Sequence, residues 1–256
     1  MRQEAGFDVS SAERGRGQGA GFDVSSAERG KGQGAGGKEQ EAGSKRQGGR
    51  GRWLILVGGL LTLVGYFGPW VDHRVAGLVI SGLDVGEYVK FLPAIRGLQI
   101  LLWREGFYLP LLTVSLSFSL YAYRPALRYP WWLRAIMLLV AIAAALNLLP
   151  PAWSPAVLFT PDYGLQPEFR LQTLWIGLAL LAVAFSPLLA LLPRWSSATV
   201  VTLLCVGTLW WPIPNFLRIL PGISELYQQP LTAGWGVWVM AGGLIVLSGS
   251  VLFTRE

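Results

Sequence analysis

Six long apolar runs constrain the fold of this chain more than any other feature. An α-helix rises 1.5 Å per residue, so about 20 apolar residues cross the hydrocarbon core of a bilayer. Residues 53–256 hold only 11 Lys/Arg and 8 Asp/Glu, too few to cover a water-soluble domain. The sequence therefore predicts an all-α integral membrane bundle. Its six expected transmembrane helices span residues 53–71, 107–123, 131–149, 173–192, 198–215 and 234–253.

Prolines modify two of these runs. Pro187 lies inside the fourth run and is expected to kink that helix, because proline removes a backbone donor and clashes with the preceding turn. Pro212 and Pro214 interrupt the fifth run. The second run is close to the minimum length for a span.

The first 52 residues have a different composition. Residues 5–19 and 20–34 are tandem copies of one 15-residue unit, and they differ only at Arg16 and Lys31. Glycine, serine and charged residues dominate, so we expect a disordered tail, 1–52, ahead of the membrane domain, 53–256. The repeat is interpreted either as a recent duplication or as a bivalent binding tail.

Charge and tryptophan both bear on orientation. Lys and Arg are more frequent in the segments that share a side with the amino terminus, so the positive-inside rule favours cytoplasmic N- and C-termini. The 12 tryptophans fall near the ends of the expected helices, as in an interfacial belt. We expect a multi-pass protein of a bacterial cytoplasmic membrane.

Small residues indicate how the helices meet. Gly58 and Gly65, and likewise Gly242 and Gly249, recur at a seven-residue spacing that allows close backbone approach in lipid. The expected partners are membrane lipids and other membrane subunits that pack against such faces. The sequence has no basic face interleaved with stacking aromatics, so no nucleic-acid partner is expected.

Residues 72–106 form the longest link between expected helices. Asp84 followed by Glu87 has capping-box spacing and predicts a short helix over 85–92, stopped by Pro93, with a second short helix over 94–103. Such a pair suits either an interfacial hairpin or a re-entrant segment.

The candidate catalytic residues lie in and just before this link. Asp72 and His73 follow the first apolar run directly, and His73 is the single histidine. They are interpreted as an interface anchor, or alternatively as a proton-transfer pair that Asp84, Glu87, Asp162 or Glu168 would complete.

No other chemistry is indicated. One histidine and one cysteine, Cys205, give no metal-ligand spacing, and no cofactor motif is present, so neither a metal nor a cofactor is expected. The helix centres carry no charged residue, unlike those of proton pumps and voltage sensors. The leading hypothesis is a non-enzymatic accessory or structural component of a membrane complex. The alternatives are a transporter for a lipid or neutral solute, and a membrane enzyme with an outer-face site at Asp72 and His73.

Overall fold

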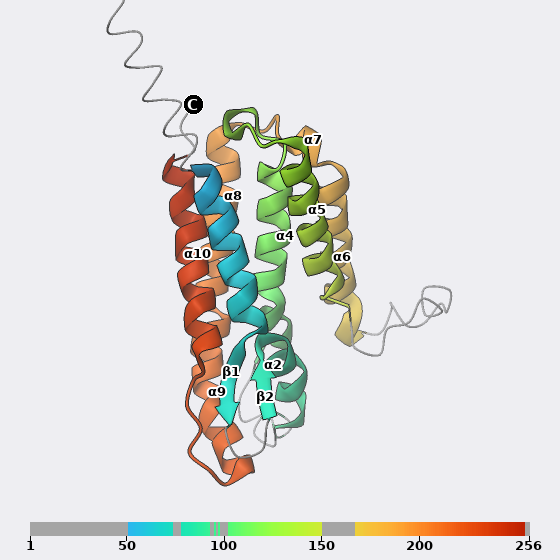
Figure 1. Cartoon of the computed structure of the whole chain (residues 1–256). Helices are drawn as coiled ribbons and strands as arrows, with labels where there is room; N and C mark the ends of the chain where they lie inside the picture. Colours follow the sequence, from blue (N-terminus) through green and yellow to red (C-terminus); the bar gives the residue numbers. More distant parts are fainter. Residues whose placement is uncertain are drawn as a thin grey trace, which may run out of the picture. The chain divides into compact units, whose positions relative to one another are not determined.

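The computed structural model describes residues 51–73, 78–92, 102–149 and 167–253, together with Ile95 and Gly97. The tandem repeat of the tail lies outside the described residues. The described chain is mainly helical, which confirms the predicted all-α class (Figure 1). The long helices are Gly51–Phe67, α4 (Leu109–Tyr121), α5 (Trp131–Leu146), α6 (Pro167–Ala184), α8 (Arg194–Trp210), α9 (Pro212–Tyr227) and α10 (Trp235–Phe253). The short ones are α2 (Gly82–Tyr88), α7 (Ser186–Leu189) and the 3-10 turns η2 (Val89–Phe91), η3 (Arg104–Tyr108) and η4 (Pro125–Leu127).

Each of the six predicted ranges contains a helix, although the lengths differ from the prediction. Within the described residues, two helical stretches, Arg194–Tyr227 and Trp235–Phe253, are long and apolar enough to cross a membrane. The helices Gly51–Phe67, Trp131–Leu146 and Arg170–Ala184 are apolar but shorter.

Prolines set several helix boundaries. The fourth predicted helix is divided, because α6 ends at Ala184 and α7 restarts with Pro187 in its first turn. Pro212 stands in the first turn of α9, where a missing N–H costs nothing, so helical structure resumes directly after α8. The fifth predicted helix was expected to end at residue 215, whereas helical structure continues through α9 to Tyr227.

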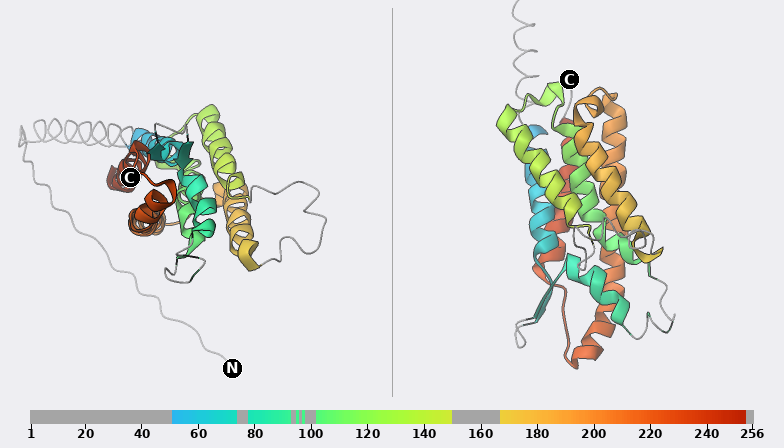
Figure 2. Two further views of the ribbon diagram at one scale, coloured as in Figure 1. Left: turned by 90° about the horizontal axis from the view of Figure 1, so that it is seen from below. Right: turned by 90° about the vertical axis from the view of Figure 1, so that its right-hand side faces the viewer.

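Helix α4 lies at the centre of the bundle. Eleven of its 13 residues are buried, and it contacts α5, α6, α7 and α8 (Figure 1 and Figure 2). Its hydroxyl groups bond to neighbouring helices: Thr113 pairs with Thr208 of α8 at 2.7 Å, and Ser115 donates to the Ala141 carbonyl of α5 at 2.9 Å. Polar side chains thus join the central helix to its neighbours.

Glycine brings the first and last described helices together. A Cβ on Gly58 would lie 2.6 Å from the Leu247 backbone nitrogen, and one on Gly65 would strike the Met240 backbone. On α10 the close residues are Gly236 and Gly243. The predicted use of Gly58 and Gly65 is consistent with this seam.

The other predicted pair does not belong to the seam. A Cβ on Gly242 or Gly249 would meet nothing within 4 Å. Gly236 and Gly243 have the same seven-residue spacing, so the sequence pattern alone could not tell which pair faces inward. Gly242 and Gly249 lie on the outward side of α10.

A β-hairpin replaces the end of the first predicted span. The helix ends at Phe67, because Pro69 cannot continue it, and β1 (Pro69–His73) pairs antiparallel with β2 (Leu78–Ser81). The prediction of a helix to residue 71 was wrong for this reason. The second short helix expected over 94–103 falls largely outside the described residues.

The glycine seam gives a matched pair of substitutions. Gly65→Ala should destabilise the protein by about 1–3 kcal/mol, because the added methyl group forces helix Gly51–Phe67 away from α10. Gly242→Ala should be neutral or stabilising by about 0.5–1 kcal/mol, because alanine favours a helix and the site is open. Detergent-induced unfolding followed by circular dichroism measures both, and equal destabilisation would contradict the assigned seam.

Candidate functional site

Four of the polar residues singled out in the sequence, Asp72, His73, Asp84 and Glu87, belong to the hairpin and α2, which together with η2 and η3 form one unit. This unit is called the head here, and it includes the last turn of α9, because Tyr227 stacks on Tyr88 of α2 at 6.4 Å. The backbone of β1 also bridges to Ala233, which precedes α10. These contacts tie the head to the end of α9 and to the segment that leads into α10.

Asp84 takes part in the N-terminal cap of α2. Ser81 is the N-cap, its hydroxyl accepts from the Asp84 N–H at 3.4 Å, and the Asp84 carboxylate accepts from the Ser81 N–H at 2.9 Å. This is a capping box shifted by three residues from the predicted one. The helix accordingly runs over 82–88 and not 85–92, with the 3-10 turn η2 following it.

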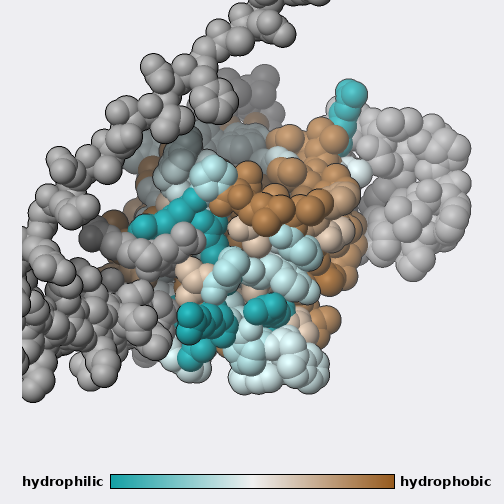
Figure 3. All heavy atoms as spheres, turned by 90° about the horizontal axis from the view of Figure 1, so that it is seen from above, coloured by the Kyte–Doolittle hydropathy of each residue, from teal (hydrophilic) through white to brown (hydrophobic). Residues whose placement is uncertain are grey.

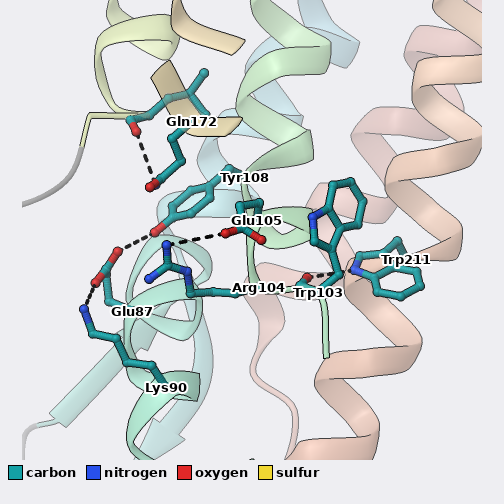
Figure 4. A network of polar contacts seen from close by, with 9 residues as sticks. Glu87, Lys90, Trp103, Arg104, Glu105, Tyr108, Gln172 and Trp211 are labelled. Carbon is teal, nitrogen blue, oxygen red and sulfur yellow. Dashed lines mark hydrogen bonds and ion pairs between the residues drawn. The ribbon is translucent and has the colours of Figure 1, made fainter. Parts of the chain in front are cut away.

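Glu87 is the centre of the most connected polar cluster in the head (Figure 4). One carboxylate oxygen accepts from the Tyr108 hydroxyl at 2.6 Å, and the other contacts the Lys90 ammonium at 2.6 Å. Arg104 lies next to Tyr108 in Figure 4 and pairs with Glu105 at 3.5 Å. The carboxylate thus links α2 to η3, the segment that leads into the central helix.

Two glycines make room for this cluster. A Cβ on Gly86 would lie 3.1–3.2 Å from the end of the Tyr108 ring, so glycine lets the tyrosine cross α2 and reach Glu87. A Cβ on Gly106 would strike the Trp211 indole, whose N–H donates to the Trp103 carbonyl at 3.2 Å. The second contact ties η3 to the junction of α8 and α9.

Gln172 of α6 points toward Tyr108 from the bundle side (Figure 4). Its amide nitrogen donates to the Leu148 carbonyl at 3.4 Å, while its oxygen is buried without a hydrogen-bond partner. Tyr66, at the end of the first described helix, also has a buried hydroxyl without a partner. The inner side of the cluster therefore holds polar atoms whose hydrogen-bonding capacity is not filled.

The environment of Glu87 decides what its carboxylate can do. Burial raises the pKa of Glu87, but hydrogen bonds from Lys90 and Tyr108, helped by the nearby charge of Arg104, outweigh burial and hold that pKa below its ordinary value of 4.5. General bases work best with a pKa near the working pH. Glu87 is thus a charged structural group at neutral pH, and a weak base.

The other predicted catalytic residues are only partly located. The backbones of Asp72 and His73 pair with Val79 and Leu78 in the hairpin, so these residues do not sit at the helix end as expected. Glu168 lies in the first turn of α6. Asp162 lies outside the described residues. The hairpin places Asp72 and His73 in the same unit as α2, while the described carboxylates of Asp84 and Glu87 are engaged elsewhere.

Sequence reasoning missed Tyr108 and Gln172, which complete the cluster from η3 and α6. Both lie at the edge of apolar runs, where polar residues look like interfacial positions. The local signal for the tyrosine is a glycine directly before a carboxylate: Gly86 has no side chain, so an aromatic ring can pack beside Glu87.

Comparison of the chain with protein-family models, with curated proteins and with solved structures found no match.

The Glu87 cluster predicts a pH dependence. Because its folded-state pKa is depressed, Glu87 contributes stability above about pH 4.5, and this contribution is lost as the pH falls through the folded-state pKa. Glu87→Gln should lower the unfolding temperature at pH 7. Between pH 5 and 3, the unfolding temperature of this variant should fall less than that of the parent. Glu225→Gln, at an exposed position of α9, is the control and should change neither. Thermal unfolding across this pH series would contradict the assignment if both variants matched the parent.

Proposed function

We propose that this chain is a multi-pass protein of a bacterial cytoplasmic membrane, with six spans and both termini in the cytoplasm, and that it acts as a non-enzymatic accessory or structural component. The carrying observation is that the hydroxyl groups of the central helix α4 are buried inside the bundle, while large apolar side chains are exposed on its outer faces. The head would then lie on the outer side of the membrane.

The outward faces of the helices support lipid as their solvent. Large apolar side chains are exposed along α6, α8, α10 and helix Gly51–Phe67, among them Leu178, Leu203, Ile245 and Val64. Soluble monomers rarely expose contiguous apolar patches above a few hundred Å². Figure 3, which looks onto the end of the bundle opposite the head, shows hydrophobic and hydrophilic residues side by side.

Exposed tryptophans lie near both ends of α8. Trp195 and Trp210 are both exposed on α8, and 15 residues of helix separate them by about 22 Å. Indole prefers the membrane interface, so the two rings would lie toward opposite interfaces, with a separation shorter than the hydrocarbon core of about 30 Å. The 34-residue stretch Arg194–Tyr227 is about 51 Å long, so the end of α9 would extend beyond the core into the head.

The central helix favours a structural role over transport. Carriers need a water-accessible or substrate-sized space near the midplane. In this chain α4 is buried on nearly all sides, and the Phe118 ring fills the space beside Gly59. The low pKa of Glu87 likewise favours a structural role over catalysis in the head.

A native cysteine tests the sealed core. Cys205 is fully buried on α8, which packs against α4. In membrane vesicles we expect a water-soluble maleimide added on either side to leave Cys205 unlabelled, and to label it after denaturation. Labelling of the folded protein from one side would contradict the structural role and support transport. A variant with cysteine at exposed Glu225, in the head and outside the predicted spans, after Cys205→Ser provides the positive control for labelling from the outer side.

The accessory role requires a partner in the membrane. Gly242 and Gly249 leave the outward side of α10 open to close approach by another helix. A photo-crosslinking residue at Ile245, on this side, should join one protein of defined mass in living cells, whereas the same residue at Leu178 on α6 should join lipid alone. Identical products from both positions would overturn the accessory role. Failure of the chain to remain in the membrane fraction after alkaline extraction would overturn insertion itself.

A further inference from the structure

At the end of the bundle opposite the head, every charged side chain among the described residues is positive. Five arginines lie there, at the start of helix Gly51–Phe67, in the α4–α5 connection and at the starts of α5 and α8: Arg52, Arg124, Arg128, Arg134 and Arg194. The described Asp and Glu residues belong to β1, α2, η3, the start of α6 and the end of α9. These arginines therefore have no described carboxylate at their end of the molecule.

Arg124 is the deepest of the five. Its residue is 4% exposed, and its guanidinium donates to the Ser197 hydroxyl of α8 at 2.8 Å. Withdrawing a cation from water is unfavourable unless an opposite charge or several acceptors compensate for it. One neutral hydroxyl compensates poorly, so the surroundings of Arg124 favour an anion.

A second buried group lies near this cation. The Tyr121 side chain is 1% exposed, and its hydroxyl has no hydrogen-bond partner. Tyr121 is the last residue of α4 and precedes Arg124 by three positions. Buried polar atoms in proteins are nearly always bonded, so an unfilled hydroxyl three residues before the buried Arg124 indicates a ligand atom.

The start of α8 adds a third contribution. Arg194 begins this 17-residue helix, and no side chain caps it. The positive end of the helix dipole and the exposed amides of an uncapped first turn both favour an anion. Ser197 lies in the same first turns and already bonds to Arg124, so the two contributions meet at one place.

Flanking tryptophans identify the source of the anion. Trp131 at the start of α5 is 81% exposed, and Trp195 beside Arg194 is 73% exposed. Exposed indoles next to arginines are typical of the headgroup region of a bilayer. We propose that the α4–α5 connection and the start of α8 form a binding site for the phosphate group of an anionic phospholipid, held by Arg124, Arg194, Ser197 and Tyr121.

This site rests on the proposed membrane insertion, and not on the accessory role. Full-length protein in mild detergent would be supplied with phosphatidylglycerol or phosphatidylcholine, and retained lipid would be counted by native mass spectrometry. The parent should retain phosphatidylglycerol about tenfold more than phosphatidylcholine. Arg124→Gln should abolish this preference. Arg128→Gln removes the same charge at an exposed position of the same connection and should preserve it.

Tyr121→Phe separates binding from folding if Arg124→Gln does not fold. If the Tyr121 hydroxyl makes no contact with lipid, its removal should leave the lipid preference unchanged. Because the hydroxyl has no partner in the protein, the lipid-free variant should then be at least as stable as the parent. A hydroxyl that contacts phosphate should reduce the preference when it is removed. No reduction in Tyr121→Phe, or equal losses in Arg124→Gln and Arg128→Gln, would overturn the site.

Two further measurements distinguish a lipid site from a general phosphate site and from a failure of membrane insertion. Inorganic phosphate at millimolar concentration should not raise the unfolding temperature of the parent, whereas phosphatidylglycerol should raise it. An equal rise with inorganic phosphate would support a phosphate site but overturn its assignment to lipid. A parent protein that requires detergent and yet prefers neither lipid would overturn the site while leaving the proposed insertion intact.

Discussion

Burial of α4 on nearly all sides is the constraint on which the rest of the structure depends. A helix in this position has no solvent for its side chains, so each hydroxyl must find a neighbour or remain unfilled. Thr113 and Ser115 reach α8 and α5, whereas the Ser117 hydroxyl has no partner. The surrounding helices can then present apolar faces outward, since the polar contacts are made inside.

The two ends of the bundle differ in how their charged side chains are paired. In the head, opposite charges lie close together, and Glu87 links α2 to η3 through Tyr108. At the other end the arginines have no described acidic neighbour, and Arg124 is nevertheless withdrawn from water. The asymmetry fits an environment in which one end has its own proteinaceous counter-charges and the other meets an anionic surface.

The sequence predicted the helical class well, because periodic apolar runs dominate the composition and leave few alternatives. It failed where a local residue overrides such a run. Pro69 ends the first helix early, and the apolar residues that follow it form strands. Ser81 caps α2 in place of Asp84, because a hydroxyl three residues earlier completes the same motif. Asp84 and Glu87 could be noticed from spacing, but Tyr108 and Gln172 could not, because contacts between distant segments leave no local pattern.

The seam between helix Gly51–Phe67 and α10 also has a consequence for biogenesis. Its two halves, around Gly65 and Gly243, are among the most distant segments of the domain, so the first helix emerges from the ribosome long before its mate. At common synthesis rates the delay is roughly 10–40 s. During that interval the exposed glycine face of the early helix has no native neighbour.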